Sequence, residues 1–524
     1  MKKKEEISKK PQEKRKKRKK KDLDLEMLTP EQRAFIEREE KINKINDKMN
    51  QPVLAITYLF AFLIIGLMGY VIHFMVVEKD QVIANAANSR LDKYAANVLR
   101  GDIISSDGKV LATNQGDTRY YPYGDLFAHA VGYSSYSKAG IELIGNFYLS
   151  DSNANVLERF VNTLKEEKNE GDTVVSTLDY ELQKVAYDAL GAANGAVVVM
   201  EPDTGKILAM VSKPDFDPND IDTIWKEATD ENNNNENSGG DGGNEELDEA
   251  VLLNRATQGL YPPGSTFKVL TTLSYIRQNP IRYKKYSYAC TNEESVFNGV
   301  SVHCYNRKTH GEQELSDALA NSCNQAYADI GVELDVDEWR DTLESFLFNK
   351  SLPYTDASAT SRFYLDGKSD KGYIPQTAFG QGDTLISPLH NALIVSTIAN
   401  GGLMMKPYLI DSIENYKGTR IRKFSPSSYD TLLTAKEVEI LTDYMKQVVD
   451  EGTAADYFAG APYSVAGKTG TAEYANGEHD YSWFVGFSSV DEPEVVVSIL
   501  VEKSDVNGVR ATAVARKILD SYHN

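Results

Sequence analysis

A serine and a lysine three residues apart could perform nucleophilic catalysis. Ser265 and Lys268 follow the turn-forming residues Pro262, Pro263 and Gly264, so Ser265 is predicted to open a helix. Residues at i and i+3 share one helix face, which would bring the amine within reach of the hydroxyl. A serine is a poor nucleophile until a base takes its proton, and a lysine buried beside another cation can be neutral enough to be that base. The pair therefore predicts a serine nucleophile with a lysine base.

That spacing alone is a weak signal, because Ser135 and Lys138 repeat it without a preceding turn or a helical pattern. Two further motifs favour the first pair. Residues 322–324 (Ser-Cys-Asn) are the only S-x-N triplet of the chain, and residues 468–470 are its only K-T-G. Lys468 is predicted to lie inside a strand, where a buried lysine is costly unless it has a function.

In this order the motifs resemble the S-x-x-K, S-x-N and K-T-G signature of the penicillin-binding proteins, which are serine acyltransferases that penicillin acylates. The resemblance covers nearly all of the chain from Arg100 onward. Two segments, 100–112 and 140–142, are similar to the N-terminal module of class B members. Three others are similar to the transpeptidase domain of the family: 214–219, 254–256 and 380–382. We therefore expect a short class B member, of the penicillin-binding protein 2 or division transpeptidase type.

The resemblance implies a peptidoglycan D,D-transpeptidase. Ser265 would attack the carbonyl between the two terminal D-alanines of a stem peptide, and Lys268 would take its proton. The backbone N–H groups of Ser265 and Thr471 would form the oxyanion hole. D-alanine would leave, and an amine of a neighbouring glycan strand would resolve the acyl-enzyme into a crosslink. Penicillin and other β-lactams would acylate the same serine as inhibitors.

The resemblance also assigns roles to the other motif residues. Ser322 and Asn324 would relay protons and hold the substrate amide, and Lys468 would keep the site positive. The residues that would bind the substrate are Thr469, Gly470 and Thr471, of which the two threonines would meet its carboxylate. No metal and no cofactor is expected, because the mechanism needs none and no cysteine–histidine cluster stands out in the sequence.

Other functions stay open at this point. A β-lactamase or a β-lactam sensor shares the three motifs, although the segment at 100–171 favours a synthase. A D,D-carboxypeptidase would release D-alanine to water without forming crosslinks. A non-catalytic scaffold of a wall-building complex would not need intact motifs. A Ser-His-Asp hydrolase is disfavoured, because the seven histidines are scattered and no serine lies in a G-x-S-x-G motif.

The pattern of apolar residues from 172 onward predicts a mixed α/β (α+β) fold. Apolar runs at 195–200 and 207–211 predict two strands joined by a turn, and helical spacing predicts a helix at 178–190. Three more strands and a closing helix are expected near the end of the chain, at 463–474, 482–489, 495–502 and 511–522. The resemblance implies that the strands form a central antiparallel sheet flanked by helices.

The sequence divides into four predicted parts, at 1–52, 53–77, 78–171 and 172–524. They are a basic tail with a juxtamembrane helix, a transmembrane helix, a non-catalytic dimerisation or pedestal module, and the transpeptidase domain. Residues 230–249 are rich in Asn, Gly and acidic residues and are expected to form a flexible surface loop. The third part is too short for a glycosyltransferase domain. A separate membrane glycan polymerase of the shape, elongation, division and sporulation family is therefore the expected partner.

One apolar segment predicts the location of the protein. Residues 53–77 are 25 consecutive residues without Asp, Glu, Lys or Arg, enough to cross a hydrocarbon core of about 30 Å as a helix. Residues 2–21 carry 13 Lys and Arg, which favours a cytoplasmic N-terminus. The net charge of −20 disfavours nucleic-acid binding. We expect a single-pass protein of the cell membrane whose catalytic domain is extracytoplasmic.

The chain has three cysteines. Cys290 and Cys304 flank a loop outside the cytoplasm, and they either form a disulfide or remain two buried thiols. A disulfide would close a loop of 15 residues and stabilise the protein by about 3 kcal/mol in the chain-entropy model. Cys323, inside the second motif, is expected to be a small packing residue that points away from the cleft.

Overall fold

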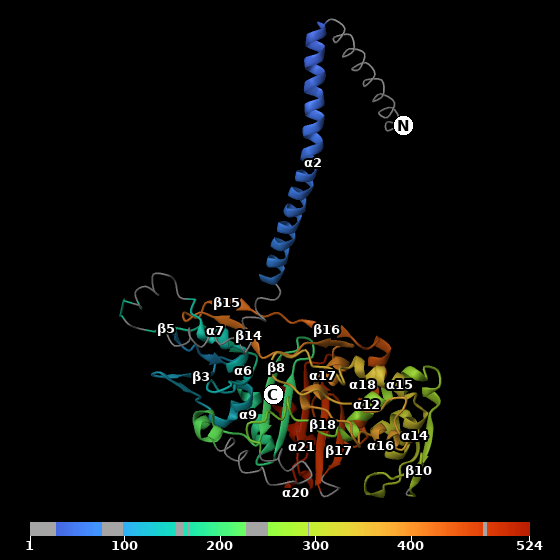
Figure 1. Ribbon diagram of the computed structural model, residues 1–524. Helices are drawn as coiled ribbons and strands as arrows, with labels where there is room; N and C mark the ends of the chain where they lie inside the picture. The colour runs from blue at the N-terminus through green and yellow to red at the C-terminus, as the bar shows by residue number, and fades with distance from the viewer. Residues whose placement is uncertain are drawn as a thin grey trace, which may run out of the picture. The chain divides into compact units, whose positions relative to one another are not determined.

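The computed structural model describes residues 28–75, 98–153, 162, 164–165, 168–226, 250–291, 293–474 and 479–524. The chain forms two compact units, Met1–Asn85 and Ala86–Asn524. The predicted loop at 230–249 lies outside the described residues, as do the basic residues at 2–21. Figure 1 shows the helix of the first unit in blue and the elements of the second unit from cyan to red.

The first unit contains one long helix, α2 (Pro30–His73). Thr29 caps its N-terminus: the Thr29 hydroxyl accepts a hydrogen bond of 3.3 Å from the Gln32 backbone, and the Gln32 side chain accepts one of 3.0 Å from the Thr29 backbone. The helix continues through Pro52, so the expected juxtamembrane helix and the apolar segment from residue 53 are parts of one helix. By length and composition, α2 is able to cross a membrane.

A five-stranded antiparallel sheet forms the centre of the second unit. In spatial order its strands are β17 (Val465–Tyr474), β18 (His479–Ser488), β19 (Val495–Val501), β7 (Gly195–Met200) and β8 (Ile207–Lys213). Every residue of β7, β8 and β19 is buried, which is typical of strands covered on both faces. The five predicted strands are confirmed, although β18 begins at residue 479 rather than 482. Figure 1 shows the green and red strands side by side in this sheet.

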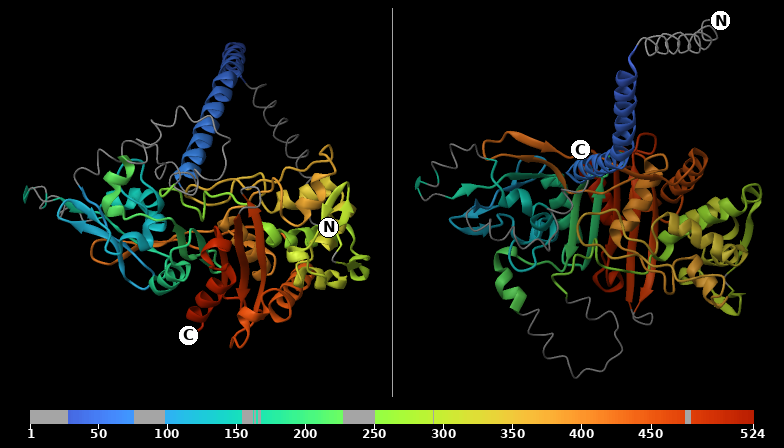
Figure 2. Two further views of the ribbon diagram at one scale, coloured as in Figure 1. Left: turned by 90° about the horizontal axis from the view of Figure 1, so that it is seen from below. Right: turned by 45° about the horizontal axis from the view of Figure 1, so that its top comes forward.

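Helices cover both faces of this sheet (Figure 2). On one face α9 (Tyr180–Leu190) lies against β7 and β8, and α21 (Ala511–Tyr522) lies against β18 and β19 and packs on α9. On the other face α17 (Pro388–Ala399), nearly all of whose residues are buried, contacts β7, β18 and β19. The predicted mixed α/β fold, with a central antiparallel sheet flanked by helices, is therefore confirmed.

A group of helices packs beside β17 at the edge of the sheet. The 3₁₀ turn η4 (Gly264–Phe267) and the helix α18 (Ala435–Asp450) contact β17 directly. Next to them lie α12 (Lys268–Gln278), α13 (Leu315–Ala320), α14 (Asn324–Glu333), α15 (Val336–Ser345) and α16 (Tyr373–Ala378). Because α12 contacts α13, α14 and α18, the three sequence motifs, on η4, at the start of α14 and on β17, come together at this edge.

Two small hairpins precede α13. Strand β9 (Ser287–Cys290) pairs with β12 (Gly311–Glu314), and β10 (Ser295–Phe297) pairs with β11 (Val300–Val302). Of the residues in these four strands, all of which the structure describes, only Cys290, Val302 and Gln313 are buried. The hairpins therefore have very little apolar core of their own.

A six-stranded mixed sheet combines strands from distant parts of the chain. Its spatial order is β15 (Arg420–Lys423), β14 (Ile410–Glu414), β6 (Thr173–Ser176), β2 (Ile103–Ile104), β3 (Val110–Gln115) and β4 (Thr118–Tyr120). Strands β2 and β6 are parallel, and the other neighbours are antiparallel. The sheet includes residues on both sides of 171, where a module boundary is expected, and that boundary stays a prediction.

The remaining short elements connect these layers. Strand β1 (Val98–Leu99) pairs with β5 (Asn169–Glu170), and β13 (Leu403–Met405) pairs with β16 (Ser428–Thr431). The short helices are η2 (Gly124–Phe127), α5 (Ala128–Val131), α6 (Gly140–Ile144), α7 (Asn146–Ser150), η3 (Pro218–Asp220), η5 (Tyr283–Lys285), η6 (Tyr305–Arg307), α19 (Ala455–Phe458) and α20 (Ser504–Asn507).

A buried ion-pair network joins the segments at 100–112 and 140–142. Glu142 is fully buried, and its carboxylate lies 2.5 Å from Arg100 Nε and 2.7 Å from Arg119 Nε. Burial by itself raises the pKa of Glu142, but the charges of Arg100 and Arg119 outweigh it and lower that pKa below its usual value. The carboxylate therefore stays ionised inside the protein, and its two partners hold these segments together.

Candidate active site

The predicted nucleophile and base lie on one continuous turn and helix. Ser265 is in the 3₁₀ turn η4, and Lys268 is the first residue of α12. The predicted helix is present and opens with a 3₁₀ turn, in which the N–H of Lys268 donates to the carbonyls of Ser265 and Thr266. Residues i and i+3 eclipse in a 3₁₀ turn, so Ser265 and Lys268 project from the same side. Lys268 is fully buried and Ser265 is partly exposed.

Glycine is required where this turn meets its neighbours. Gly264 has φ +52°, and a Cβ on it would lie 2.5 Å from the carbonyl oxygen of Thr471 on β17. The Gly264 N–H donates a hydrogen bond of 2.9 Å to the Gly380 carbonyl. Gly380 has φ +83°, and a Cβ on it would lie 1.9 Å from the Gly264 carbonyl oxygen. The nucleophile turn thus packs backbone to backbone against β17 and against the Gly380 segment.

The amine of Lys268 is held by the S-x-N motif. Its Nζ donates to the carbonyl oxygen of Ser322 at 2.8 Å, to the Ser322 hydroxyl at 3.2 Å and to Asn324 Oδ1 at 2.8 Å. The amine also lies 5.2 Å from the ring centre of Tyr327 and 6.0 Å from that of Phe379. Sequence reasoning missed these two aromatic residues, because neither belongs to a motif.

The Ser322 hydroxyl connects all three motifs. Lys468, fully buried on β17, donates from its Nζ to Ser322 Oγ at 3.0 Å and to the carbonyl oxygen of Thr469 at 2.9 Å. A hydroxyl has two acceptor lone pairs, so Ser322 Oγ can accept from both Lys268 and Lys468. Ser322 itself has left-handed backbone angles, with φ +55°.

Burial changes the protonation of both lysines. It lowers the pKa of Lys268 to about 8. Burial, and after it the positive charge of Lys268, lower the pKa of Lys468 well below its usual value. Two amines that share one hydroxyl titrate as a pair, so one of them loses its proton at a pH where an exposed lysine keeps it. That Lys268 is the one that acts as base stays a prediction.

Residues 469–471 line a groove along the free edge of the sheet. The groove has a volume of about 800 Å³, and its lining includes Ser265, Ser322, Asn324, Thr469, Gly470 and Thr471. Because β17 is the outermost strand, its outward backbone groups can pair with an extended chain lying in the groove. A side chain at Gly470 would be crowded, since a Cβ would lie 3.0 Å from Thr266 Cγ2 and 3.0 Å from Trp483 Cβ.

Two family models match the chain. The model of the penicillin binding protein transpeptidase domain matches residues 195–520, more than half of the chain. The chain belongs to the penicillin-binding protein transpeptidase family. A second model, the penicillin binding protein A dimerisation domain, matches residues 100–174, so the predicted resemblance to class B penicillin-binding proteins is confirmed.

Individual relatives agree with this assignment. The peptidoglycan D,D-transpeptidase PbpA of Mycolicibacterium smegmatis is 29% identical over 489 residues, which cover 87% of this chain and 94% of the relative. The solved D,D-transpeptidase domain of a peptidoglycan glycosyltransferase from Eggerthella lenta has 31% identity and a TM-score of 0.69, covering 81% of this chain and 98% of that one. The imipenem acyl-enzyme complex of penicillin-binding protein A from M. tuberculosis has 26% identity and a TM-score of 0.70, covering 83% and 100%.

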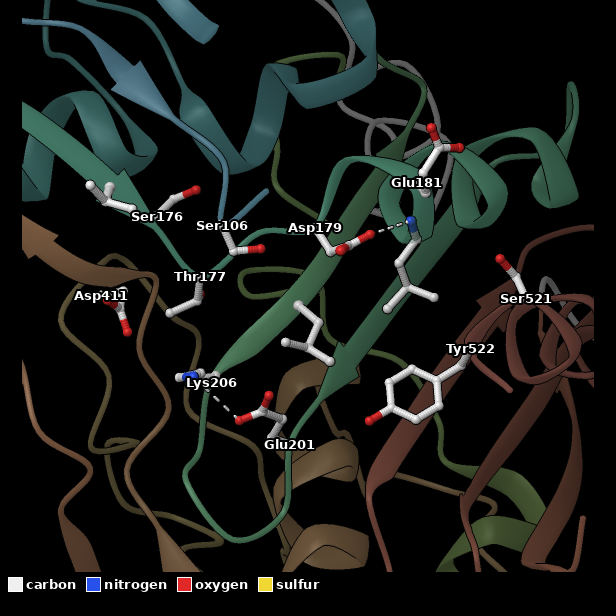
Figure 3. Close-up of a pocket in the computed structure, with 13 residues that line it drawn as sticks. Ser106, Ser176, Thr177, Asp179, Glu181, Glu201, Lys206, Asp411, Ser521 and Tyr522 are labelled. Atoms are coloured by element: carbon white, nitrogen blue, oxygen red, sulfur yellow. Dashed lines mark hydrogen bonds and ion pairs between the residues drawn. The ribbon is translucent and has the colours of Figure 1, made fainter. Parts of the chain in front are cut away.

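A second hollow in this penicillin-binding protein lies away from the motifs (Figure 3). It has a volume of about 590 Å³, and none of the residues that line it belongs to the three motifs. Three of its charged side chains have partners: Lys206 lies 3.7 Å from Glu201, and Asp179 accepts a hydrogen bond of 2.8 Å from the backbone of Leu182 at the start of α9. Figure 3 shows Asp179, Lys206 and Glu201 among the residues that line the hollow.

The cysteines of this penicillin-binding protein form a cluster that the sequence did not predict. Cys290 and Cys304 are buried free thiols with their sulfurs 3.7 Å apart, so of the two alternatives the buried thiols are found. Cys323 is buried and does not line the groove, as expected, but its sulfur lies 3.7 Å from that of Cys304. His310 joins the three sulfurs. No such cluster stood out in the sequence, because His310 comes beside Cys290 only through the pairing of β9 with β12.

Proposed function

We propose that this penicillin-binding protein is a membrane-anchored peptidoglycan D,D-transpeptidase that works through an acyl-enzyme on Ser265. The observation that carries the proposal is the convergence of Lys268 and Lys468 on the Ser322 hydroxyl, beside a serine that opens into the groove. Relatives of nearly the same length are named peptidoglycan D,D-transpeptidases, and one similar structure is an imipenem acyl-enzyme.

In the acylation step, neutral Lys268 takes the hydroxyl proton of Ser265. The Ser265 oxygen attacks the carbonyl carbon between the two terminal D-alanines, and the negative charge develops on the carbonyl oxygen. The backbone N–H groups of Ser265 and Thr471 stabilise that charge. The close packing of Gly264 on the Thr471 carbonyl keeps these two donors near each other. The C–N bond then breaks, and the departing D-alanine nitrogen receives a proton by way of Ser322.

In the second step the acyl group moves from Ser265 to an amine of a neighbouring stem peptide. The amine nitrogen attacks the ester carbonyl, loses a proton to Lys268 or Ser322, and forms a new amide bond. The C–O bond to Ser265 breaks, and the serine oxygen takes a proton back. Asn324, which accepts a hydrogen bond from Lys268, fixes the amine and contacts the substrate amide.

Substrate recognition relies on β17. An extended stem peptide pairs with the free edge of this strand, and its terminal carboxylate binds Thr469 and Thr471. Lys468 supplies a positive charge close to that carboxylate when protonated. The Thr469 hydroxyl lies 2.5 Å from that of Thr453, which holds it at the groove.

The membrane topology follows from charge. Helix α2 crosses the membrane once, and the 13 Lys and Arg at 2–21 keep the N-terminus in the cytoplasm. The transpeptidase part then lies outside, where peptidoglycan is built. The segment before the transpeptidase domain matches a dimerisation domain. As its source of glycan strands we propose a separate membrane glycan polymerase of the shape, elongation, division and sporulation family.

The reaction itself tests the proposal. The full-length protein in detergent is given glycan strands that carry stem peptides, and products are separated after digestion to muropeptides. We expect crosslinked dimers together with free D-alanine, and neither product from Ser265→Ala. D-alanine without dimers would show that the protein is a carboxypeptidase. Rapid turnover of penicillin without either product would show that it is a β-lactamase. No acylation at all would show that it is a non-catalytic scaffold.

A further inference from the structure

Two aromatic rings lie next to the buried amine of Lys268. Its Nζ lies over the ring of Tyr327, 5.2 Å from the ring centre, and over the ring of Phe379, 6.0 Å from the ring centre. Tyr327 belongs to α14 and is fully buried, whereas Phe379 follows α16 and lines the groove. A cation within about 6 Å of a ring centre is attracted to the electron-rich face of the ring. The two rings can therefore discriminate between the charged and the neutral form of Lys268.

The polar partners of Lys268 already account for its three ammonium protons. Its Nζ donates to the carbonyl oxygen and the hydroxyl of Ser322 and to Asn324 Oδ1. An ammonium group has three donors and no acceptor, so these three contacts satisfy it. The rings add an attraction that needs no further hydrogen bond and that exists only while the amine carries a positive charge.

Adjacent residues of α12 hold both rings in place. The hydroxyl of Thr272 lies 2.5 Å from that of Tyr327. The hydroxyl of Thr271 donates a hydrogen bond of 2.9 Å to the backbone carbonyl of the residue directly before Phe379. Both threonines are buried, and they lie one helical turn after Lys268, on the same side of α12. The two rings are thus fixed relative to the helix that carries the amine.

The phenol of Tyr327 is not suited to proton transfer. Burial raises the pKa of Tyr327 well above its usual value, so the hydroxyl stays neutral at any pH at which the protein works. That hydroxyl is engaged with Thr272, whereas the amine of Lys268 lies over the ring. Tyr327 therefore acts on Lys268 through its ring rather than through its hydroxyl.

We propose that Tyr327 and Phe379 are positioning residues that stabilise the ammonium form of Lys268 and thereby lower the barrier to acylation. In that step the O–H bond of Ser265 breaks and an N–H bond forms on Lys268. The serine oxygen bonds to the carbonyl carbon of the substrate, and negative charge moves to the carbonyl oxygen. Lys268 is neutral before this step and positive after it, so the rings bind the transition state more strongly than the ground state. The inference rests on the proposed function, in which Lys268 is the base.

Other groups around Lys268 set the charge balance on which the rings act. Burial lowers the pKa of Lys268 to about 8, and the thiols of Cys323, at the start of α14, and Cys304, before η6, act in the opposite direction. Lys468 on β17 shares the Ser322 hydroxyl with Lys268, and two positive charges at this place disfavour each other. Without the attraction of the rings, the pKa of Lys268 would be lower still.

The pH dependence of acylation separates this role from ordinary packing. Above the pKa of Lys268 the amine is neutral in the free enzyme, so only the transition state gains from the rings. Weakening the rings should therefore lower the plateau of the acylation rate by about 2- to 30-fold, the range of a cation–π contact. Well below that pKa the rings stabilise the free enzyme and the transition state alike, and the rate should change little. The midpoint of the profile should move to lower pH by the logarithm of the same factor.

Fluorinated phenylalanines at position 327 test the inference. Fluorine withdraws electrons from the face of the ring and scarcely changes its shape, so the attraction for a cation weakens while the packing is kept. The full-length protein in detergent is prepared as Tyr327→Phe and with mono-, di- or trifluorinated phenylalanine at that position. The second-order rate constant for a fluorescent penicillin is measured across the pH profile. Tyr327→Phe should stay close to the wild type, and the plateau should fall with each added fluorine while the rate at low pH is kept.

Tyr275 provides the matched control. It is a buried tyrosine of α12, and its ring packs edge-on against that of Tyr286, with 5.5 Å between the ring centres. The same fluorinated series at position 275, referred to Tyr275→Phe, should leave the rate unchanged at low and at high pH. Trifluorinated phenylalanine in place of Phe379 should lower the plateau less than at position 327, because the Phe379 ring lies farther from the amine.

Three results would overturn the inference and leave the proposed function intact. A plateau that stays constant along the series at position 327 would exclude an electrostatic role for the ring. Equal falls of the rate at low and at high pH would show that the ring only maintains packing. Equal falls for the series at positions 275 and 327 would show a general effect of the substitutions. A wild type that penicillin does not acylate at any pH would instead overturn the proposed function, and this inference with it.

Discussion

Lys268 and Lys468 donate hydrogen bonds to the same acceptor, the hydroxyl of Ser322, at 3.2 and 3.0 Å. The two buried amines come from different elements, α12 and β17, and each disfavours the positive charge of the other. A change in the charge of Lys268 therefore alters the electrostatic environment of Lys468, because only the Ser322 hydroxyl lies between the two amines. Mutation can separate the two roles proposed for these lysines, the proton acceptor and the positive charge, most cleanly of all parts of the mechanism.

The first prediction concerns those lysines. Arginine keeps a positive charge but cannot deprotonate, so Lys268→Arg should lower the acylation rate constant by about 10²- to 10⁴-fold, the usual contribution of a general base. Lys468→Arg preserves the charge proposed for that position and should have a milder effect, mainly on binding of the carboxylate. Rate constants with one penicillin decide between the two roles. Equal losses, or a milder loss at Lys268, would reverse the assignment.

The second prediction concerns pH. The base must be neutral, and burial lowers the pKa of Lys268 to about 8. Acylation should therefore be slow at lower pH, where Lys268 is protonated, and should rise to a plateau above about pH 8. The second-order rate constant for a fluorescent penicillin, measured across this range and corrected for hydrolysis of the reagent, gives the profile. A rate that stays flat or falls with rising pH would exclude a neutral lysine base.

The third prediction isolates the close packing of the nucleophile turn. Gly380 and Gly108 both have φ +83°, but a Cβ at Gly380 would lie 1.9 Å from the Gly264 carbonyl oxygen, whereas nothing lies within 4 Å at Gly108. Gly108→Ala should lower the free energy of unfolding by only about 1–2 kcal/mol, the penalty for a left-handed backbone, and should leave the acylation rate unchanged. Gly380→Ala should in addition lower the acylation rate by about 10²-fold or more, because the clash with the Gly264 carbonyl displaces the turn that carries Ser265. Similar labelling rates for the two variants would contradict the packing argument.

The fourth prediction concerns the buried carboxylate of Glu142. Glu142→Gln leaves Arg100 and Arg119 without their counter-ion and should destabilise the protein by about 3–5 kcal/mol near neutral pH. Because Arg100 and Arg119 hold the pKa of Glu142 below its usual value despite burial, this advantage is complete above the ordinary carboxyl pKa and is lost as the pH falls through the lowered one.

The midpoint of urea unfolding measures this effect, and Asp117→Asn is the control. Asp117 pairs with Lys168 at the surface, where 76% of the Asp117 side chain is exposed, so its replacement should change stability by less than about 1 kcal/mol. Equal shifts of the urea midpoint for the two variants would show that burial of the Glu142 network adds nothing to the stability of the protein.

The sequence predicted the central sheet because its strands are continuous apolar runs. Residues 195–200 and 495–501 are buried throughout, and such runs are readable without knowing their partners. The pairing of β14 with β6 was not readable, since it joins residues more than 200 positions apart and leaves no local pattern. The juxtamembrane helix and the apolar segment were predicted as separate parts, and the structure joins them in one helix, α2, which continues through Pro52.

The candidate site was predicted residue by residue from its motifs, and the structure brings Ser265, Lys268, Ser322, Asn324 and Lys468 to one groove edge. What the sequence could not show was the shared hydroxyl, because the contact of Lys468 with Ser322 depends on how β17 meets α14. The cysteine cluster was hidden for a similar reason. His310 becomes a neighbour of Cys290 only through the β9–β12 pairing.

The most direct test of the central claim is the position of the covalent penicillin adduct. The full-length protein is labelled with penicillin, digested and mapped by mass spectrometry. Ser265→Ala and Ser135→Ala serve as matched variants, because both serines precede a lysine at the same spacing. We expect a penicilloyl ester on the peptide containing Ser265, unchanged labelling of Ser135→Ala and no labelling of Ser265→Ala. An adduct on any other residue, or undiminished labelling of Ser265→Ala, would contradict it.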